Sequence, residues 1–294
     1  MKAAALLPAA ALLAATHQPE ARQPVRPVPP VGVASVGRAD FRLDGPPVQG
    51  GLVRGQVPEG TRRLTLDGAP VAVGRDGRFV VGFDRDHGPT ALLMADFASG
   101  SASEQRIAVA PRSWRIEHVN IAQRPPAVPD EAYRRRREAE LARIRAARAA
   151  RSDAAGWAQR FVWPATGRIS GAFGSQRIFR GVAAAYHSGV DVAAGAGAPV
   201  VAPADGVVVL AGPPAFSLEG NLVIIDHGMG LNSAFLHLAT AQVSAGQRVR
   251  QGERIGTVGA TGRATGPHLH WSLMWNGARL DPQLAAGAMG AAAR

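Results

Sequence analysis

A chain of 294 residues, of which 46% are hydrophobic and 19% charged, is long enough to form two small domains with separate cores. The absence of cysteine excludes disulfide bonds and thiolate chemistry, so any metal ion must be held by His, Asp or Glu. The formal charge of +11 comes almost wholly from arginine, because Lys2 is the only lysine. This charge either favours an anionic partner or reflects a composition biased towards Arg, Ala, Gly and Pro.

The N-terminal segment has the layout of a secretory signal peptide. Residues 1–15, MKAAALLPAAALLAA, place one positive charge before an apolar run that is too short to span a bilayer comfortably. We expect cleavage and a periplasmic or secreted protein without stable membrane insertion; an uncleaved segment would be an N-terminal membrane anchor. Residues 16–39 contain five prolines among polar residues and are expected to form a linker.

Short strand-like runs separated by turn signals fill residues 40–120. Asp67-Gly68 and Asp76-Gly77 are hairpin-type pairs between alternating segments. Strands at such regular spacing need a second sheet to cover them, so we predict a small β-sandwich. This part contains no catalytic constellation, and its expected role is spacing, docking or intramolecular regulation.

Residues 121–155 are predicted to be a linker that contains a basic helix. The helix-forming stretch covers 130–151, and Asp130 is a candidate N-cap after Pro129. Its apolar stripe is thin, which favours a solvated connecting helix over a specific basic binding helix.

A second β domain is predicted for residues 156–286, followed by a flexible tail at 287–294. Strand-like runs separated by Gly or Pro indicate a mostly antiparallel fold without a helical layer, so the whole chain is expected to be mainly β. Five of the eight histidines fall in this domain. Such clustering in a chain without cysteine points first to zinc.

The histidine spacings suggest which side chains converge. His187 and Asp191 lie four positions apart around a glycine, which lets the backbone bend towards one ion. His268 and His270 would project from the same side of a strand, because residues i and i+2 share a face. His237 stands between apolar neighbours and, considered alone, is typical of a buried structural histidine.

Together these pieces resemble the LytM/lysostaphin-type zinc endopeptidases, a family of murein hydrolases. The resemblance covers about residues 161–284, and its pieces occur in the family's order: Trp163-Pro164, Gly167–Gly174, His187–Asp191, Pro203–Val207, Gly220–Gly228, Phe235–Leu238 and Thr265–His270. It implies a lysostaphin-type antiparallel domain with lipoyl-like β-roll elements. The implied activity is zinc-dependent hydrolysis of peptide cross-links in bacterial peptidoglycan, whose peptide stems would be the partner, with no nucleic acid involved.

The resemblance also implies a role for each matched residue. His187, Asp191 and His270 would hold one Zn²⁺ per chain and leave the fourth tetrahedral position open to solvent. His237 and His268 would be catalytic: one accepts a proton and the other stabilises the developing oxyanion, and the sequence does not say which does which.

The chain departs from the family pattern at two aromatic positions. Phe235 replaces a tyrosine and so removes a hydroxyl that could contact substrate, and Trp271 replaces a phenylalanine. His227 is expected to be structural or, at most, a residue at the rim of the site. Four arginines near the motifs are candidates for contacts with substrate carboxylates, namely Arg168, Arg177, Arg180 and Arg263.

Two other function classes compete with the endopeptidase. A non-catalytic LytM-like module would activate a cell-wall amidase, but such members usually lack several ligands, whereas all five positions are intact here. A biotinyl/lipoyl-type carrier would explain the rhythm of 207–212 and 249–256, but it needs an acceptor lysine, and Lys2 lies in the expected signal peptide.

Overall fold

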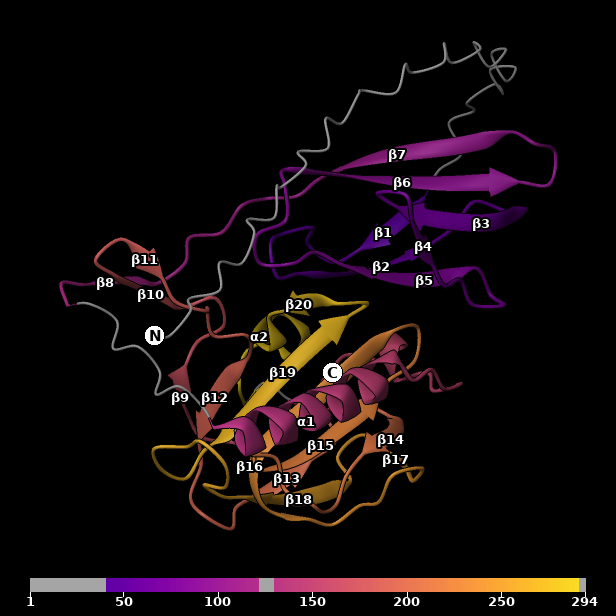
Figure 1. The fold of residues 1–294 in the computed structure, drawn as a ribbon. Coiled ribbons are helices and arrows are strands. Elements are labelled where there is room, and N and C mark those ends of the chain that lie inside the picture. Colours follow the sequence, from indigo (N-terminus) through magenta and orange to yellow (C-terminus); the bar gives the residue numbers. More distant parts are fainter. Residues whose placement is uncertain (1–40, 122–129, 291–294) are drawn as a thin grey trace, which may run out of the picture. The chain divides into compact units, whose positions relative to one another are not determined.

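The computed structural model describes residues 41–121 and 130–290 and confirms a mainly β protein (Figure 1). The expected signal peptide at 1–15 and the linker at 16–39 lie outside the described residues. Within the described ranges, no helix combines the length and the apolarity needed to cross a membrane.

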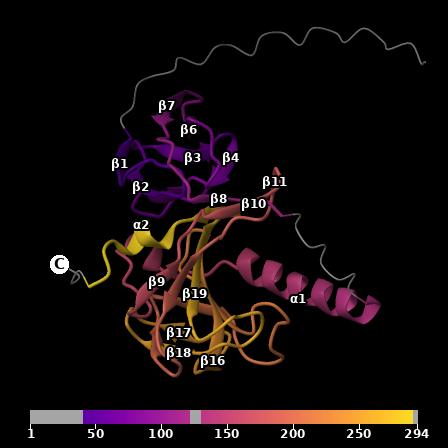
Figure 2. The ribbon, with the colours of Figure 1, turned by 90° about the vertical axis from the view of Figure 1, so that its left-hand side faces the viewer.

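The N-terminal part consists of two antiparallel sheets, one with the order β1-β2-β5 and one with the order β4-β3-β6-β7 (Figure 2). Apolar residues from both sheets are buried, which explains why the short strands need each other. The strands are β1 (Arg42–Asp44), β2 (Leu52–Gln56), β3 (Thr61–Leu66), β4 (Ala69–Val71), β5 (Arg78–Gly82), β6 (Thr90–Phe97) and β7 (Ala102–Ala108).

The residues of the turn fix the register of the hairpin formed by β3 and β4. Asp67 and Gly68 both have positive φ, 50° and 81°, and they connect Leu66 directly to its partner Ala69. Two consecutive positive φ angles define the turn whose twist matches that of a hairpin, and Asp-Gly tolerates them well. The hairpin signal in the sequence is therefore confirmed.

The C-terminal part is built on one large antiparallel sheet with the order β17-β14-β15-β16-β19-β12-β9. Strand β13 pairs with β18, which also joins β16, and β20 extends the sheet beside β19. The strands are β9 (Arg168–Gly171), β12 (Val190–Ala193), β13 (Pro199–Val201), β14 (Gly206–Leu210), β15 (Asn221–Asp226), β16 (Leu231–Ala241), β17 (Arg248–Val249), β18 (Arg254–Val258), β19 (Leu269–Trp275) and β20 (Ala278–Leu280). A 3₁₀ turn (Gly156–Ala158) precedes this sheet, and α2 (Pro282–Ala286) follows it.

Besides the two sandwich sheets and the large sheet, a small three-stranded sheet joins the segment after the sandwich to the C-terminal part. It contains β8 (Ile116–Val119), β10 (Gln176–Phe179) and β11 (Val182–Ala183), and β8 runs parallel to β10. The range 40–120 expected for the sandwich therefore includes a strand whose partner lies in the C-terminal part. Arg112 adds a second link, because its Nη2 donates to Asp281 Oδ2 at 2.8 Å.

Helix α1 (Glu131–Ala149) begins at the predicted N-cap, where Asp130 Oδ1 accepts from the backbone N–H of Tyr133. The helix lies across β14 and β15 of the large sheet (Figure 1). Ala147 is buried in an apolar cluster with Leu210, Phe216, Leu222, Ile224 and Ala234. Most of the helix is exposed, as expected of a connecting helix, but one face packs on the sheet, so the expectation of a β domain without any helix packed on it is wrong.

Because the apolar stripe of α1 is thin, polar contacts also hold the helix to the C-terminal part. Arg137 donates to both carboxylate oxygens of Glu219, at 2.6 and 2.7 Å. Glu140 is buried and accepts from the backbone N–H and the hydroxyl of Ser217, at 2.9 and 2.7 Å. These long-range partners cannot be read from the local pattern of the helix, which explains the wrong expectation.

Candidate metal centre and active site

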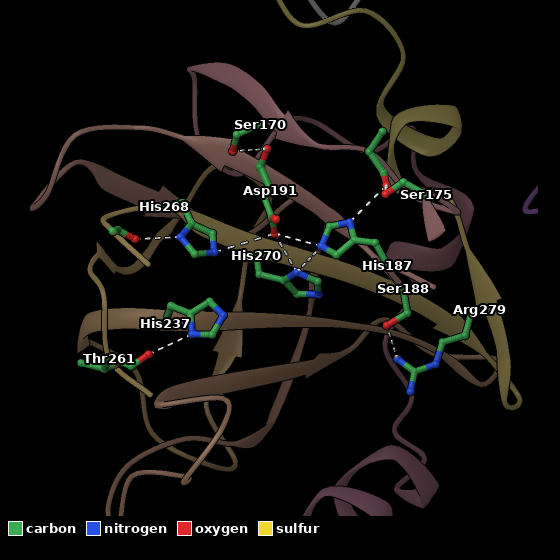
Figure 3. A network of polar contacts seen from close by, with 12 residues as sticks. Ser170, Ser175, His187, Ser188, Asp191, His237, Thr261, His268, His270 and Arg279 are labelled. Atoms are coloured by element: carbon green, nitrogen blue, oxygen red, sulfur yellow. Dashed lines mark hydrogen bonds and ion pairs between the residues drawn. The ribbon is translucent and has the colours of Figure 1, made fainter. Parts of the chain in front are cut away.

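His187, Asp191 and His270 converge at the junction of two neighbouring strands (Figure 3). Asp191 on β12 and His270 on β19 are directly paired residues, and His187 lies just before β12. Asp191 Oδ1 lies 3.1 Å from His187 Nε2 and 2.8 Å from His270 Nδ1, and the two nitrogens lie 3.1 Å apart. Tetrahedral zinc with bonds of 2.0–2.1 Å separates its ligand atoms by roughly 3.3 Å. The three atoms therefore fit one small metal ion.

Hydrogen bonds orient the rings around this point. Nδ1 of His187 lies 3.1 Å from the carbonyl oxygen of Ala172, an acceptor only, so this nitrogen carries the proton and donates. The donation fixes the ring so that Nε2 is directed towards Asp191, whose Oδ1 lies 3.1 Å away. A carbonyl that fixes the tautomer of a ligating histidine in this way is a common support for metal sites.

The charges of the trio reinforce one another. Burial raises the pKa of Asp191, but hydrogen bonds from His187 and His270 more than offset it, so the pKa is lowered and the carboxylate is charged. Burial lowers the pKa of His187, and the hydrogen bond to Asp191 outweighs that effect and raises the pKa. For His270 burial prevails and the pKa is lowered, which favours the neutral imidazole that a metal ion requires.

Two further imidazoles border the trio. The ring centroid of His237 lies 4.9 Å from that of His268 and 6.3 Å from that of His270. His237 Nδ1 donates to the carbonyl of Thr261 at 2.8 Å, and His268 Nδ1 donates to the carbonyl of Gly266 at 2.8 Å. In the neutral form of either ring Nε2 is then the nitrogen without a proton, and that of His268 lies 3.9 Å from Asp191 Oδ1. Burial, the main cause, lowers the pKa of His237, which favours its neutral form.

His237 reaches this position through an unusual backbone conformation. Its φ is +63°, a left-handed value that costs a residue with a β-carbon about 1–2 kcal/mol. His237 thereby departs from the regular alternation of β16, and its backbone N–H donates to the carbonyl of Glu219 at 2.9 Å. Strained backbone of this kind tends to persist where a side chain must be aimed at a functional site.

Two glycines leave room for the trio. A Cβ at Gly171 would lie 2.3 Å from Asp191 Oδ2, and a Cβ at Gly189 would lie 2.7 Å from His270 Nε2. Neither distance is compatible with a side chain at that position. The ligand atoms are therefore held by close backbone approach as well as by hydrogen bonds.

A cavity reaches the trio from each side. One, of about 810 Å³, is lined by His187 and Asp191 together with Arg115, Glu117, Arg177, Arg263 and other residues. The other, of about 610 Å³, lies between α1 and the large sheet and reaches His270. The trio thus lies between two cavities. The segment after the sandwich lines one of them, and α1 lines the other.

Other residues singled out in the sequence lie elsewhere. Phe235 is fully buried in the core, so a hydroxyl there could not face substrate, and the effect expected from its substitution is wrong. Trp271 is also buried and donates to Ser233 Oγ at 3.2 Å. His227 is buried and lies 2.8 Å from the carbonyl oxygen of Asp205, as a structural histidine would.

The four candidate arginines have different positions. Arg177 and Arg263 line the cavity at His187, and Arg177 also pairs with Glu117 at 2.8 Å. Arg168 and Arg180 are not among the residues that line either cavity. Sequence reasoning missed Arg148 and Arg279, which line the cavity at His270, because no local motif marks them.

Comparison with known proteins gives matches concentrated on this centre. The profile described as Peptidase family M23 matches residues 185–282. A crystal structure from Pseudomonas aeruginosa, described as a peptidase M23, is 33% identical, covers 83% of this chain and 96% of that one, and superposes with a TM-score of 0.62.

Curated relatives match a shorter region. Peptidoglycan DD-endopeptidase ShyA of Vibrio cholerae is 41% identical over 120 residues, 40% of this chain and 27% of that protein. DD-carboxypeptidase/endopeptidase Mpg of Neisseria meningitidis is 45% identical over 96 residues, 33% of this chain and 22% of that protein. The chain thus spans about a quarter of the length of these relatives.

Proposed function

Since this chain belongs to peptidase family M23, we propose that it is a zinc-dependent endopeptidase that hydrolyses peptide cross-links of bacterial peptidoglycan. The observation that carries the proposal is the convergence of His187, Asp191 and His270, with the imidazole rings of His237 and His268 beside them. Relatives named as peptidoglycan DD-endopeptidases support the choice of substrate.

The donor set suits a catalytic zinc ion. Two imidazole nitrogens and one carboxylate oxygen are a combination found in catalytic zinc sites, which keep one position open. His187, Asp191 and His270 would hold the ion. When bound, zinc would supply a Lewis acid that makes a water molecule acidic near neutral pH and polarises the scissile carbonyl.

His237 and His268 would move the protons of the reaction. With Nδ1 held by a backbone carbonyl, each ring presents Nε2 towards the reacting atoms. One would accept a proton from the attacking water and pass it to the leaving amine, and the other, once protonated, would donate to the developing oxyanion. Both roles require rings of fixed orientation, which the carbonyl of Thr261 and that of Gly266 provide.

The competing function is a non-catalytic module that activates a cell-wall amidase. The complete set of five side chains argues against it, because a binding module has no need of four imidazoles and a carboxylate gathered at one point. Zinc content and zymography on a gel that contains peptidoglycan separate the two functions. An inert protein without zinc would favour the module.

A periplasmic or secreted location fits a peptidoglycan substrate, and the proposed signal peptide at 1–15 would direct the chain there. The N-terminal part is further proposed to regulate access. Arg115 and Glu117, from the segment after the sandwich, line the cavity at His187, and α1 covers the cavity at His270. A substrate that occupies either cavity would contact these segments as well as the C-terminal part.

The test of the proposed function is digestion of purified peptidoglycan followed by mass analysis of the products. Hydrolysis of a cross-link creates one new amine and one new carboxylate in place of a peptide bond. We expect cross-linked stem peptides to be converted to monomers by wild-type protein loaded with zinc, and not by the His187→Ala variant. Unchanged cross-links after digestion with the zinc-loaded wild type would overturn the proposal.

A further inference from the structure

The cavity between α1 and the large sheet is lined by two partly buried arginine side chains that, among the described residues, no carboxylate contacts directly. Arg148 reaches the cavity from the last turn of α1, and Arg279 from β20. In the described ranges, 41–121 and 130–290, neither guanidinium forms an ion pair with a carboxylate. The cavity also reaches His270 of the proposed metal centre.

Arg148 lies among neutral partners. Its guanidinium nitrogens are 3.4 Å from Asn232 Oδ1, 3.4 Å from Ser272 Oγ and 3.0 Å from Met274 Sδ. Burial first, and then the like charge of Arg279, lower its pKa to about 10. The charge of Glu219 acts on Arg148 in the opposite direction, but both carboxylate oxygens of Glu219 accept hydrogen bonds from Arg137.

The guanidinium of Arg279 also has a neutral partner. Its Nη1 lies 3.4 Å from the hydroxyl of Ser188, the residue that follows the proposed ligand His187 (Figure 3). Burial lowers its pKa as well. Asp84 lies nearby, but its Oδ2 accepts the backbone N–H of Arg279 at 2.7 Å, not the guanidinium.

Two like charges that are removed from water and face one cavity are unfavourable unless an anion completes the site. Guanidinium groups bind planar carboxylates through paired hydrogen bonds. We propose that Arg148 and Arg279 form a subsite for a carboxylate group of the substrate peptide, on the His270 side of the scissile bond. This inference rests on the proposed function for its substrate and adds a requirement for a free acid at that position.

The rest of the cavity suits a peptide chain. Its lining includes the partly exposed apolar side chains of Ile144 and Leu236, which would pack against the aliphatic part of a stem peptide. Its volume of about 610 Å³ lies in the range of pockets that enclose small ligands. Ser188 and Ser272 add hydroxyl donors beside the two guanidiniums.

The test compares two peptides that differ in a single group. Synthetic cross-linked stem peptides carry diaminopimelate with either a free carboxylate or a carboxamide, and their binding is titrated calorimetrically to full-length zinc-loaded His268→Ala protein, which is expected not to turn them over. We expect the acid to bind at least tenfold more tightly than the amide. Adding Arg148→Gln or Arg279→Gln should remove most of this preference, whereas Arg134→Gln, on the exposed face of α1, should preserve it.

Further arms separate the alternative outcomes. The subsite would be overturned if the acid and the amide bound equally well. It would also be overturned if the preference for the acid survived each arginine substitution in protein with an unchanged unfolding midpoint. Millimolar acetate that competes equally well with both peptides would also overturn it, because the site would then hold free small anions. If the zinc-loaded wild type cleaves neither peptide but the acid preference and its arginine dependence remain, the proposed hydrolysis fails and the subsite stands.

Discussion

Asp191 and His270 occupy directly opposed positions on β12 and β19, with Oδ1 and Nδ1 only 2.8 Å apart. Because side chains alternate between the two faces of a strand, a slip of one residue in this pairing would turn one of them away from the other. The register of two strands that are distant in sequence therefore sets the geometry of the proposed metal site.

The five side chains should separate into two classes on mutation. His270→Ala or Asp191→Ala removes a ligand and is expected to abolish both zinc binding and hydrolysis. His268→Ala should retain about one zinc per chain and lose turnover by at least a hundredfold, a typical size for the loss of a proton-transfer group. Zinc content and the rate of cross-link cleavage, measured on the same preparations, check the division; a His268→Ala protein with normal turnover would contradict it.

The close approach of the Gly171 backbone to Asp191 should matter for zinc binding, as the ligands themselves do. Gly171→Ala places a methyl group 2.3 Å from Asp191 Oδ2 and must displace the carboxylate, so we expect at least a tenfold loss of zinc affinity. Gly195→Ala is the matched control, because nothing lies within 4 Å of its Cβ position. Competition with a zinc chelator measures both variants. Equal affinities would show that the geometry at Gly171 does not constrain the site.

The segment after the sandwich should govern access to the centre. Trp114 anchors this segment, with its ring 5.7 Å from that of Phe173 and against the backbone of Gly174. Trp114→Ala is expected to loosen the segment and to raise the cleavage rate severalfold on intact peptidoglycan, with less effect on a small soluble peptide. Trp114→Phe should retain the wild-type ratio of the two rates. A fall in both rates for the alanine variant would argue against regulation by this segment.

Stability should fall as the solution becomes acidic, partly because of His227. Burial lowers the pKa of this histidine to about 4, below the unfolded value of 6.5. The unfolded chain therefore binds a proton between pH 6.5 and 4 that the folded protein does not, and acidification favours unfolding by about 3 kcal/mol over this window. Denaturant titrations of wild type and His227→Gln should show a steeper loss for the wild type. Parallel pH profiles would contradict this origin.

Much of the fold follows from local sequence signals. Regular turn pairs predict the β-sandwich, and Asp67-Gly68 forms the expected hairpin because that dipeptide tolerates two positive φ angles. The i, i+2 spacing of His268 and His270 indicates a shared strand face, and both histidines border the centre. These features depend only on neighbours in the chain.

The remaining features depend on partners that are distant in sequence. Helix α1 packs on the sheet through Arg137 and Glu140, whose partners lie about eighty residues away, so its charged pattern resembles that of a solvated helix. The conformation of His237 and the fixing of its ring by the carbonyl of Thr261 are backbone effects that no side-chain motif reveals. Arg148 and Arg279 meet only in the folded protein.

The most direct test of the account is cross-link cleavage before and after exchange of the metal. Purified peptidoglycan is incubated with three samples of the full chain: as isolated, after complete removal of metal by a chelator, and after one equivalent of zinc is restored. The cross-linked stem peptides that remain are quantified by mass spectrometry. We predict that cleavage disappears with the metal and returns with zinc. Full cleavage by metal-free protein would contradict the account.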